Sequence, residues 1–317
     1  MPTGRQSVQP SPLRYIRCLL FDLGYTLWDR RRDRSAEAEA NRHTGDLLCQ
    51  QRFSERIVTG DGERIGAAFR TCFREAKHEC LRRQPGSELD GPQLVQETLR
   101  QWGNKDVARG VAVVIFYALQ IHIAIPSILF GDTIPTLAAL QARGYHLGIV
   151  SNRLWGGSGF LDDLRRIGLL RYFDPRAIAI SADVGVRKPH PDLYLQPCAT
   201  FNIAPTEAAM IGDSLCADVL GSQRLGMFTV WKPRPELWEQ IKAHQERHKQ
   251  PLTPSEVPAE EKQAHVDLDF LPDCSQRRDA YLERYQRGEI TPNMVIERLA
   301  DLLNVFVDAQ APFLWGR

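Results

Sequence analysis

The sequence lacks the paired cysteines of a zinc ribbon or a disulfide framework. Its 317 residues include seven cysteines, an odd number at scattered spacings with no C-x-x-C pair. Such usage is typical of reduced thiols in a cytoplasm. A charge excess is missing too, since 40 Lys and Arg residues against 39 Asp and Glu residues leave a formal net charge of +1. No overall field attracts nucleic acid or an acidic surface. We therefore expect a cytoplasmic protein with no nucleic-acid partner.

A long hydrophobic run is also missing. The most apolar segment, residues 111–125, is shorter than the roughly 20 apolar residues that a membrane span needs, and it contains Gln120 and His122. We interpret it as a buried helix and expect no membrane partner. Residues 1–14 are polar and proline-rich, without the apolar centre of a signal peptide. They are predicted to form a flexible N-terminal tail.

Short apolar runs typical of buried parallel strands are present. Stretches with helical spacing separate them along the chain. This alternation predicts an α/β fold built on a doubly wound parallel sheet. The expected strands lie at residues 18–21, 147–150, 178–180, 209–211 and 227–230, and the expected helices between them at residues 134–143, 160–167, 191–201 and 218–225.

The chain divides into a core, an insertion and a C-terminal part. Residues 33–125 are too many for a simple crossover and carry apolar residues at helical spacing, which predicts an inserted all-helical domain. The α/β core then comprises residues 15–32 and 126–248. Residues 249–317 begin with a proline-rich linker and continue as a C-terminal helical extension. The helices expected in this extension cover residues 275–286 and 292–307.

Four short motifs stand in a fixed order along the core. The carboxyl ends of parallel strands meet at one edge of a sheet, where ligands bind. Because Asp22, Ser151 and Asp213 lie at or just past strand ends, we expect them to converge. The motifs are residues 21–27 (FDLGYTL), 149–152 (IVSN), 186–192 (VRKPHPD) and 211–221 (IGDSLCADVLG).

These residue types permit phosphoryl transfer to a carboxylate. A carboxylate can attack phosphorus and form a covalent intermediate, and Mg²⁺ held by oxygen ligands offsets the repulsion between the two negative groups. Asp22 and Asp213 could supply such ligands. Lys188 could neutralise further charge. Ser151 and the backbone of Asn152 could position the phosphoryl oxygens.

The ordered motifs resemble those of the haloacid dehalogenase superfamily, whose members are mostly phosphatases with a Rossmann-like core. The resemblance covers the sheet from residue 17 to about residue 232, and the helical insertion is similar to the cap that many members carry after the first motif. It implies a nucleophilic Asp22 and a Mg²⁺ cofactor. The other implied roles are metal binding by Asp22, the Gly24 carbonyl, Asp213 and Asp218, orientation of the nucleophile and the phosphate by Thr26 and Ser151, and pairing of Lys188 with Asp22 and the phosphate.

One motif departs from the pattern of the phosphatases that it resembles. These enzymes usually read D-x-D-x-T, and the second Asp protonates the leaving oxygen and then activates water. Here that position is Gly24, followed by Tyr25. General acid–base help is worth about 10²–10⁴-fold. Three alternatives stay open: a substrate with a good leaving group, a proton from Tyr25, or a proton from a histidine of the insertion, namely His43, His78 or His122.

Three functions remain in competition. We favour a Mg²⁺-dependent phosphohydrolase that acts on a small phosphorylated metabolite, because Asp213 suits the metal-dependent members that the motifs resemble. The first alternative is a regulatory or binding protein that has lost turnover with the second Asp. The other is a hydrolase that cleaves a C–P or C–halogen bond. Arg153 either lines the substrate pocket or packs at the cap hinge. The insertion or the C-terminal helices could also form a homodimer interface.

Overall fold

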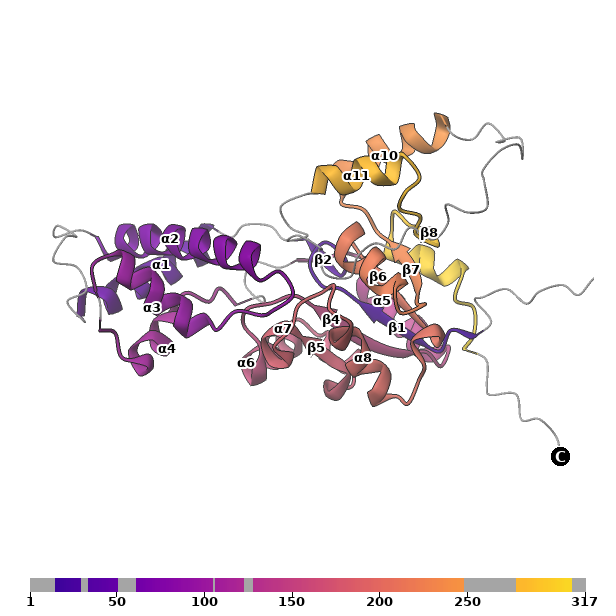
Figure 1. Cartoon of the computed structure of the whole chain (residues 1–317). Helices are drawn as coiled ribbons and strands as arrows, with labels where there is room; N and C mark the ends of the chain where they lie inside the picture. The colour runs from indigo at the N-terminus through magenta and orange to yellow at the C-terminus, as the bar shows by residue number, and fades with distance from the viewer. Residues whose placement is uncertain are drawn as a thin grey trace, which may run out of the picture.

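The computed structural model describes residues 15–29, 34–50, 61–104, 106–122, 128–247 and 278–309. The tail expected at residues 1–14 and most of the linker expected after residue 248 lie outside these ranges. Within them, a parallel sheet with helices on both faces carries a helical insertion on one side (Figure 1).

The sheet has six parallel strands, and five of them are the expected ones. Its order is β5-β4-β1-β6-β7-β8, so the first strand of the chain lies near the middle, between two strands that follow it much later. Every pairing in this sheet is parallel, which confirms the predicted fold class. The strands are β1 (Cys18–Phe21), β4 (His146–Ser151), β5 (Ile178–Ile180), β6 (Ala208–Gly212), β7 (Phe228–Trp231) and β8 (Met294–Val295).

Helices cover both faces because the strands are apolar on both. Leu19 and Phe21 of β1 belong to one hydrophobic cluster, and Cys18 and Leu20 belong to another on the opposite face. Helices α5 and α6 pack into the first cluster, and α8 packs into the second. Such two-sided burial explains why the strands read as continuous apolar runs. The core helices are α5 (Thr133–Ala142), α6 (Gly157–Arg166), α7 (Ser181–Val184), α8 (Pro191–Thr200) and α9 (Gly221–Gln223).

The described residues of the insertion form four helices, which share a hydrophobic cluster with Leu154 and Trp155 of the core. Two of these helices begin at an aspartate whose side chain accepts a backbone N–H, Asp61 and Asp90, as expected for N-caps. The short strands β2 (Trp28–Asp29) and β3 (Ile128–Leu129) pair antiparallel at the base of the insertion. The four helices are α1 (Arg34–Gln50), α2 (Gly62–Arg83), α3 (Gly91–Gln101) and α4 (Arg109–Ala118). The domain limits at residues 33 and 125 stay predictions.

The apolar segment at residues 111–125 is only partly the buried helix that we expected. Helix α4 ends at Ala118, and it buries one face that includes Ile115 and Phe116. Its other face is open, with Val114 52% and Tyr117 60% exposed. Across the described ranges, none of the helices combines the length and the apolar character that crossing a membrane requires.

The C-terminal part departs from the prediction. Helix α11 (Arg278–Gln286) falls within the expected range, but the helix expected over residues 292–307 is wrong. That stretch forms strand β8 and a 3₁₀ helix, η7 (Leu299–Asn304). The Asn293 side chain accepts hydrogen bonds from the backbone N–H and the hydroxyl of Thr229. These bonds hold the segment against the edge of β7, where pairing outweighs its helical pattern.

Helices α10 (Pro235–Arg247) and α11 lie on the same side of the sheet (Figure 1). Ile241 of α10 and Tyr281 of α11 share a cluster with Trp231 and with a π-helix, η5 (Leu215–Leu220). The fourth motif therefore lies between the sheet and these two helices.

Candidate active site

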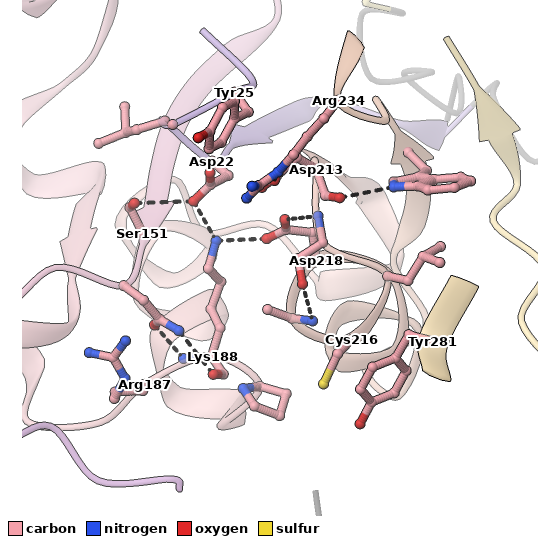
Figure 2. Close-up of a pocket in the computed structure, with 18 of the residues that line it drawn as sticks. Asp22, Tyr25, Ser151, Arg187, Lys188, Asp213, Cys216, Asp218, Arg234 and Tyr281 are labelled. Atoms are coloured by element: carbon pink, nitrogen blue, oxygen red, sulfur yellow. Dashed lines mark hydrogen bonds and ion pairs between the residues drawn. The ribbon is translucent and has the colours of Figure 1, made fainter. Parts of the chain in front are cut away.

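Residues of all four motifs line one cavity of about 230 Å³ at the carboxyl ends of β1, β4 and β6. The predicted convergence of Asp22, Ser151 and Asp213 is present, and Lys188 joins them (Figure 2). The predicted site residues that line this cavity are Asp22, Gly24, Ser151, Asn152, Arg153, Lys188, Asp213 and Asp218.

Lys188 lies at the centre of the hydrogen bonds of the site. Its ammonium nitrogen lies 2.7 Å from Asp22 Oδ1, 2.6 Å from Asp218 Oδ1 and 2.8 Å from the carbonyl oxygen of Val150. An ammonium has three N–H groups, and these three acceptors use all of them. The side chain is 3% exposed, so its position is fixed by buried contacts on every side.

The same contacts hold the Asp22 carboxylate. Its Oδ1 accepts one bond from Lys188 and one from the Ser151 hydroxyl, which lies 3.1 Å away. Its Oδ2 has no hydrogen-bond partner within the described part of the chain. One carboxylate oxygen is therefore anchored, and the other is available to a cation or a substrate.

Asp213 and Asp218 complete a cluster of three carboxylates. Asp22, Asp213 and Asp218 each offer an oxygen, and the three oxygens lie within 4.8 Å of one another. Both oxygens of Asp218 are already engaged, Oδ1 by Lys188 and Oδ2 by the backbone N–H of Ser214 at 2.9 Å. Among the described contacts, the carboxylate of Asp213 is bonded through Oδ2 alone. Asp22 and Asp213 therefore each keep an oxygen that suits a hard divalent cation.

Burial and repulsion from neighbouring carboxylates raise the pKa values of Asp213 and Asp218. Burial raises the pKa of Asp218 to about 7, although Lys188 opposes that rise. Burial and the neighbouring Asp22 raise the pKa of Asp213, against the effect of Arg234. Burial alone would lower the pKa of Lys188, but Asp218 and Asp22 outweigh it and raise the pKa. The lysine therefore stays charged beside acids that are costly to ionise together.

Gly212, the last residue of β6, makes room for this arrangement. A Cβ atom at this position would overlap the side chain of Asp218. The glycine thus allows the Asp218 carboxylate to pass close to the strand and reach Lys188.

If the site hydrolyses phosphate esters, as the motifs predict, we expect Gly212→Ala to displace Asp218 and lower turnover about tenfold to 100-fold, because Lys188 would lose one of its two carboxylates. The measurement is kcat/KM on an activated phosphate ester together with the melting temperature. Gly159→Ala is the matched control, since a Cβ there meets nothing within 4 Å. Equal activity in both variants would show that Asp218 does not support the site.

Three further predicted residues differ in how they relate to the site. The Asn152 amide bonds the backbone N–H and carbonyl of Lys188, at 2.7 and 3.0 Å, so this side chain holds the lysine loop. Thr26 is fully buried, does not line the cavity, and its hydroxyl has no hydrogen-bond partner within the described residues. The guanidinium of Arg153 lies 4.6 Å from the centre of the Phe160 ring, while the residue also lines the cavity.

More than half of the chain matches a known protein family. Residues 66–232, just over half of the chain, match the family described as haloacid dehalogenase-like hydrolase. The chain belongs to this family. The match spans three of the four motifs, and the first motif precedes it.

Among haloacid dehalogenase-like relatives, one is a glyceraldehyde 3-phosphate phosphatase of Methanopyrus kandleri. It is 34% identical over 105 residues, which cover 32% of this chain and 42% of the relative. Another is a phosphoserine phosphatase of Thermus thermophilus, 33% identical over 111 residues that cover 33% of this chain and 41% of the relative. The matched part therefore spans about two fifths of the length of these relatives.

Two solved haloacid dehalogenase-like structures share the fold. A 2-haloacid dehalogenase from Pseudomonas syringae pv. Tomato DC3000 aligns over 92% of this chain and 98% of its own, with a TM-score of 0.52 and 22% identity. A phosphatase from Thermococcus onnurineus aligns over 93% and 100%, with a TM-score of 0.51 and 19% identity. At this identity the likeness concerns the fold alone.

A loop of the insertion reaches the haloacid dehalogenase-like core beside Lys188. Glu88 is almost fully buried and accepts hydrogen bonds from Arg187, at 2.6 Å, and from the Ser181 hydroxyl. Main-chain bonds run from Glu88 to Gly185 and from Arg187 to Gly86, each 3.0 Å long. Our motif analysis missed this contact, because nothing in the spacing of an exposed-looking Glu in a loop reveals a partner about 100 residues away.

Sequence reasoning also missed Arg234. It lies three residues after the end of β7, and its Nε donates to Asp213 Oδ2 at 2.6 Å. The available signal was its position just past the carboxyl end of a predicted strand, where ligands bind in such sheets.

Of the alternative proton sources, Tyr25 lies in the described cavity lining and the three histidines do not. Within the described lining of the cavity there is no histidine, whereas Tyr25 is part of it. His122 instead bonds Asp163 of helix α6 through Nδ1 at 2.9 Å. The arrangement gives His43, His78 and His122 no place in the described cavity wall.

One cysteine, Cys216, differs from the expectation that the thiols are reduced. Cys216 lines the cavity and is disulfide-bonded, so the prediction of reduced thiols is wrong for this residue. A disulfide depends on the approach of two Cβ atoms in the fold, which a sequence interval does not reveal. The free cysteines in the described ranges are Cys18, Cys49, Cys72, Cys80 and Cys198.

Proposed function

We propose that this chain is a Mg²⁺-dependent phosphohydrolase that acts on a small phosphorylated metabolite through an aspartyl-phosphate on Asp22. The carrying observation is the asymmetric Asp22 carboxylate, with Oδ1 held by Lys188 and Ser151 and Oδ2 without a hydrogen bond from the described residues. The phosphatase names of relatives from Methanopyrus kandleri and Thermus thermophilus support the same reaction class.

In this proposal the side chains divide the work. Asp22 attacks phosphorus, and the bond from phosphorus to the leaving oxygen breaks with its electron pair on that oxygen. Lys188 and Ser151 fix the Asp22 carboxylate, which positions it for in-line attack on the phosphoryl group. Water then hydrolyses the aspartyl-phosphate, releases inorganic phosphate and restores the carboxylate.

The carboxylate cluster fits the proposed magnesium ion. Oxygen donors are the ligands that Mg²⁺ prefers, and Asp22 and Asp213 each keep an oxygen outside the described hydrogen bonds. The Gly24 carbonyl is proposed as a third ligand, and Asp218 as a support that acts through Lys188 and Ser214. When bound, the cation neutralises charge on the transferring phosphoryl group.

The helical insertion is proposed to act as a cap over the substrate. Pro85 and Arg187 line the cavity together with the catalytic motifs, and the loop around Glu88 ties this part of the insertion to the core. The size and polarity of the substrate beyond its phosphoryl group would then depend on this contact region. Arg153, which directly follows the second motif, is also proposed to contact the substrate.

Removal of divalent metal tests the proposal. We expect hydrolysis of acetyl phosphate and of 4-nitrophenyl phosphate to fall about 100-fold or more in EDTA, because metal stabilisation is worth several kcal/mol. Excess Mg²⁺ should restore the full rate. A melting curve in EDTA checks that the loss is not unfolding. Turnover that EDTA leaves unchanged would contradict the proposal and favour metal-independent cleavage of another bond.

Gly24 favours a second candidate, a regulatory protein on the same scaffold. Without a carboxyl group at this position, the site has lost a group worth about 10²–10⁴-fold in rate. This candidate predicts binding of Mg²⁺ and phosphate by calorimetry with no turnover of acetyl phosphate, whose leaving group needs no proton. Turnover of acetyl phosphate would eliminate it.

A further inference from the structure

Arg234 reaches into the site from the loop after β7. Figure 2 shows its guanidinium pointing toward the gap between Asp22 and Asp213. Two contacts hold it there, the 2.6 Å bond from Nε to Asp213 Oδ2 and the Tyr25 ring, whose centre lies 3.7 Å from Cζ. The side chain is only 12% exposed. None of the four motifs contains this residue, and the proposed function assigns it no task.

The outer nitrogens of this guanidinium are available to a ligand. A guanidinium carries five N–H groups, and the bond to Asp213 uses the one on Nε. In the part of the chain that the structure describes, neither Nη atom has a hydrogen-bond partner, and Arg234 lines the cavity. Clamped donors aimed into a cavity are suited to an oxygen that carries negative charge, because they need no reorganisation when that charge appears.

The site has an unmet need for such a donor. When Asp22 attacks phosphorus, the electron pair of the breaking bond moves to the leaving oxygen. Gly24 offers no acid to neutralise it, and no histidine belongs to the described cavity wall. Two cations contact the Gly24–Tyr25 turn. Lys232 donates to the Tyr25 carbonyl at 3.1 Å and is not part of the described cavity lining, whereas Arg234 stacks on the Tyr25 ring and lines the cavity. Lys188 cannot serve, because Asp22, Asp218 and Val150 already use its three N–H groups.

The distribution of charge in the site also favours Arg234 as the donor to the leaving oxygen. Three carboxylates, Asp22, Asp213 and Asp218, are in contact with two cations, Lys188 and Arg234. Lys188 is shared between two acids, whereas Arg234 pairs with one and keeps four N–H groups. The second cation therefore adds positive charge on the side of the cavity where an acid is missing.

We propose that Arg234 is a catalytic residue whose Nη groups hydrogen-bond the leaving oxygen and stabilise its negative charge as the bond to phosphorus breaks. This inference rests on the proposed phosphohydrolase function and names its substrate class. Arg234 keeps its own protons, and the departed oxygen takes a proton from water. The preferred substrates are phosphate esters or anhydrides with an acidic leaving group, such as acyl and aryl phosphates, over phosphates of simple alcohols.

A series of aryl phosphates tests this role. We would measure kcat/KM with Mg²⁺ for esters that range from dinitrophenol to unsubstituted phenol, in the unaltered protein and in Arg234→Gln. We expect Arg234→Gln to lose about 100-fold on the phenyl ester, the scale of one oxyanion donor, and less than about tenfold on the dinitrophenyl ester. The plot of log kcat/KM against leaving-group pKa should therefore be steeper in the variant.

Parallel plots would overturn the proposal, because a residue that binds phosphoryl oxygens or only orients Asp213 affects all esters equally. Binding of Mg²⁺ by calorimetry separates those two cases. Arg234→Lys keeps the charge with fewer donors, should give an intermediate slope, and provides the test if Arg234→Gln does not fold. Arg176→Gln, at a side chain that is 79% exposed, is the control and should leave the slope unchanged.

The proposed function can fail separately from this role. If the unaltered protein shows no Mg²⁺-dependent turnover of even the dinitrophenyl ester, the phosphohydrolase assignment is wrong and the role of Arg234 falls with it. If turnover is present and the slopes are equal, the phosphohydrolase stands and only the role of Arg234 is wrong.

Discussion

Replacing Asp22 with asparagine is expected to lower turnover of acetyl phosphate roughly 10⁴-fold or more, the scale seen when an enzyme loses its nucleophile. An amide does not attack phosphorus, so no covalent intermediate forms. Its carbonyl oxygen can still accept the bonds from Lys188 and Ser151. The fold should therefore persist, with a melting temperature within a few degrees of the unaltered protein.

The intermediate gives this prediction a second readout. Rapid acid quench of the unaltered protein during turnover should trap one phosphoryl group per chain, and mass spectrometry of peptides should locate it at Asp22. Asp22→Asn should trap none. A phosphorylated peptide elsewhere, or turnover that survives in the variant, would contradict a nucleophilic role for Asp22.

The second large effect is a gain of catalytic activity. We expect Gly24→Asp to raise turnover of phosphates of simple alcohols about 10²–10⁴-fold, because a carboxyl group there can protonate the leaving oxygen and then activate water. Gly24 is not among the residues with positive φ, so a side chain meets no backbone strain of that kind.

Gly24→Asn is the matched control for this gain, since it adds the same bulk without an acid. Acetyl phosphate is the matched substrate, because its leaving group needs no proton and should gain little. A rise on acetyl phosphate as large as on the alkyl phosphates would mean that the new side chain acts on the metal or the fold instead of the leaving oxygen.

The sheet was the most predictable part of the fold. Its five expected strands are buried on both faces, so their apolar runs stand out whatever surrounds them. The edge strand β8 was not predictable in the same way, since Val295, Leu299 and Phe306 also fall on one face of a helix. Contacts with Thr229, far away in the sequence, decide between the two.

The candidate site was predictable where its residues follow strands in short motifs. Asp22, Ser151 and Asp213 lie at one edge because parallel strands end there, and Lys188 joins them from the loop between α7 and α8. Two other residues of the site could not be predicted in this way. Arg234 and Glu88 come from loops, and only the folded chain brings each of them beside its partner, Asp213 or Arg187.

The loop around Glu88 has a consequence for exchanging modules between relatives. Its carboxylate is 3% exposed and Arg187 is 14% exposed, and main-chain bonds run on both sides of the pair. A chimera that replaces the helical insertion would leave a buried guanidinium without its counter-charge, next to the loop of Lys188. Breaking a buried pair from one side costs about 3–5 kcal/mol. A transplanted insertion must therefore bring an acid to this position, or the recipient core must give up Arg187 as well.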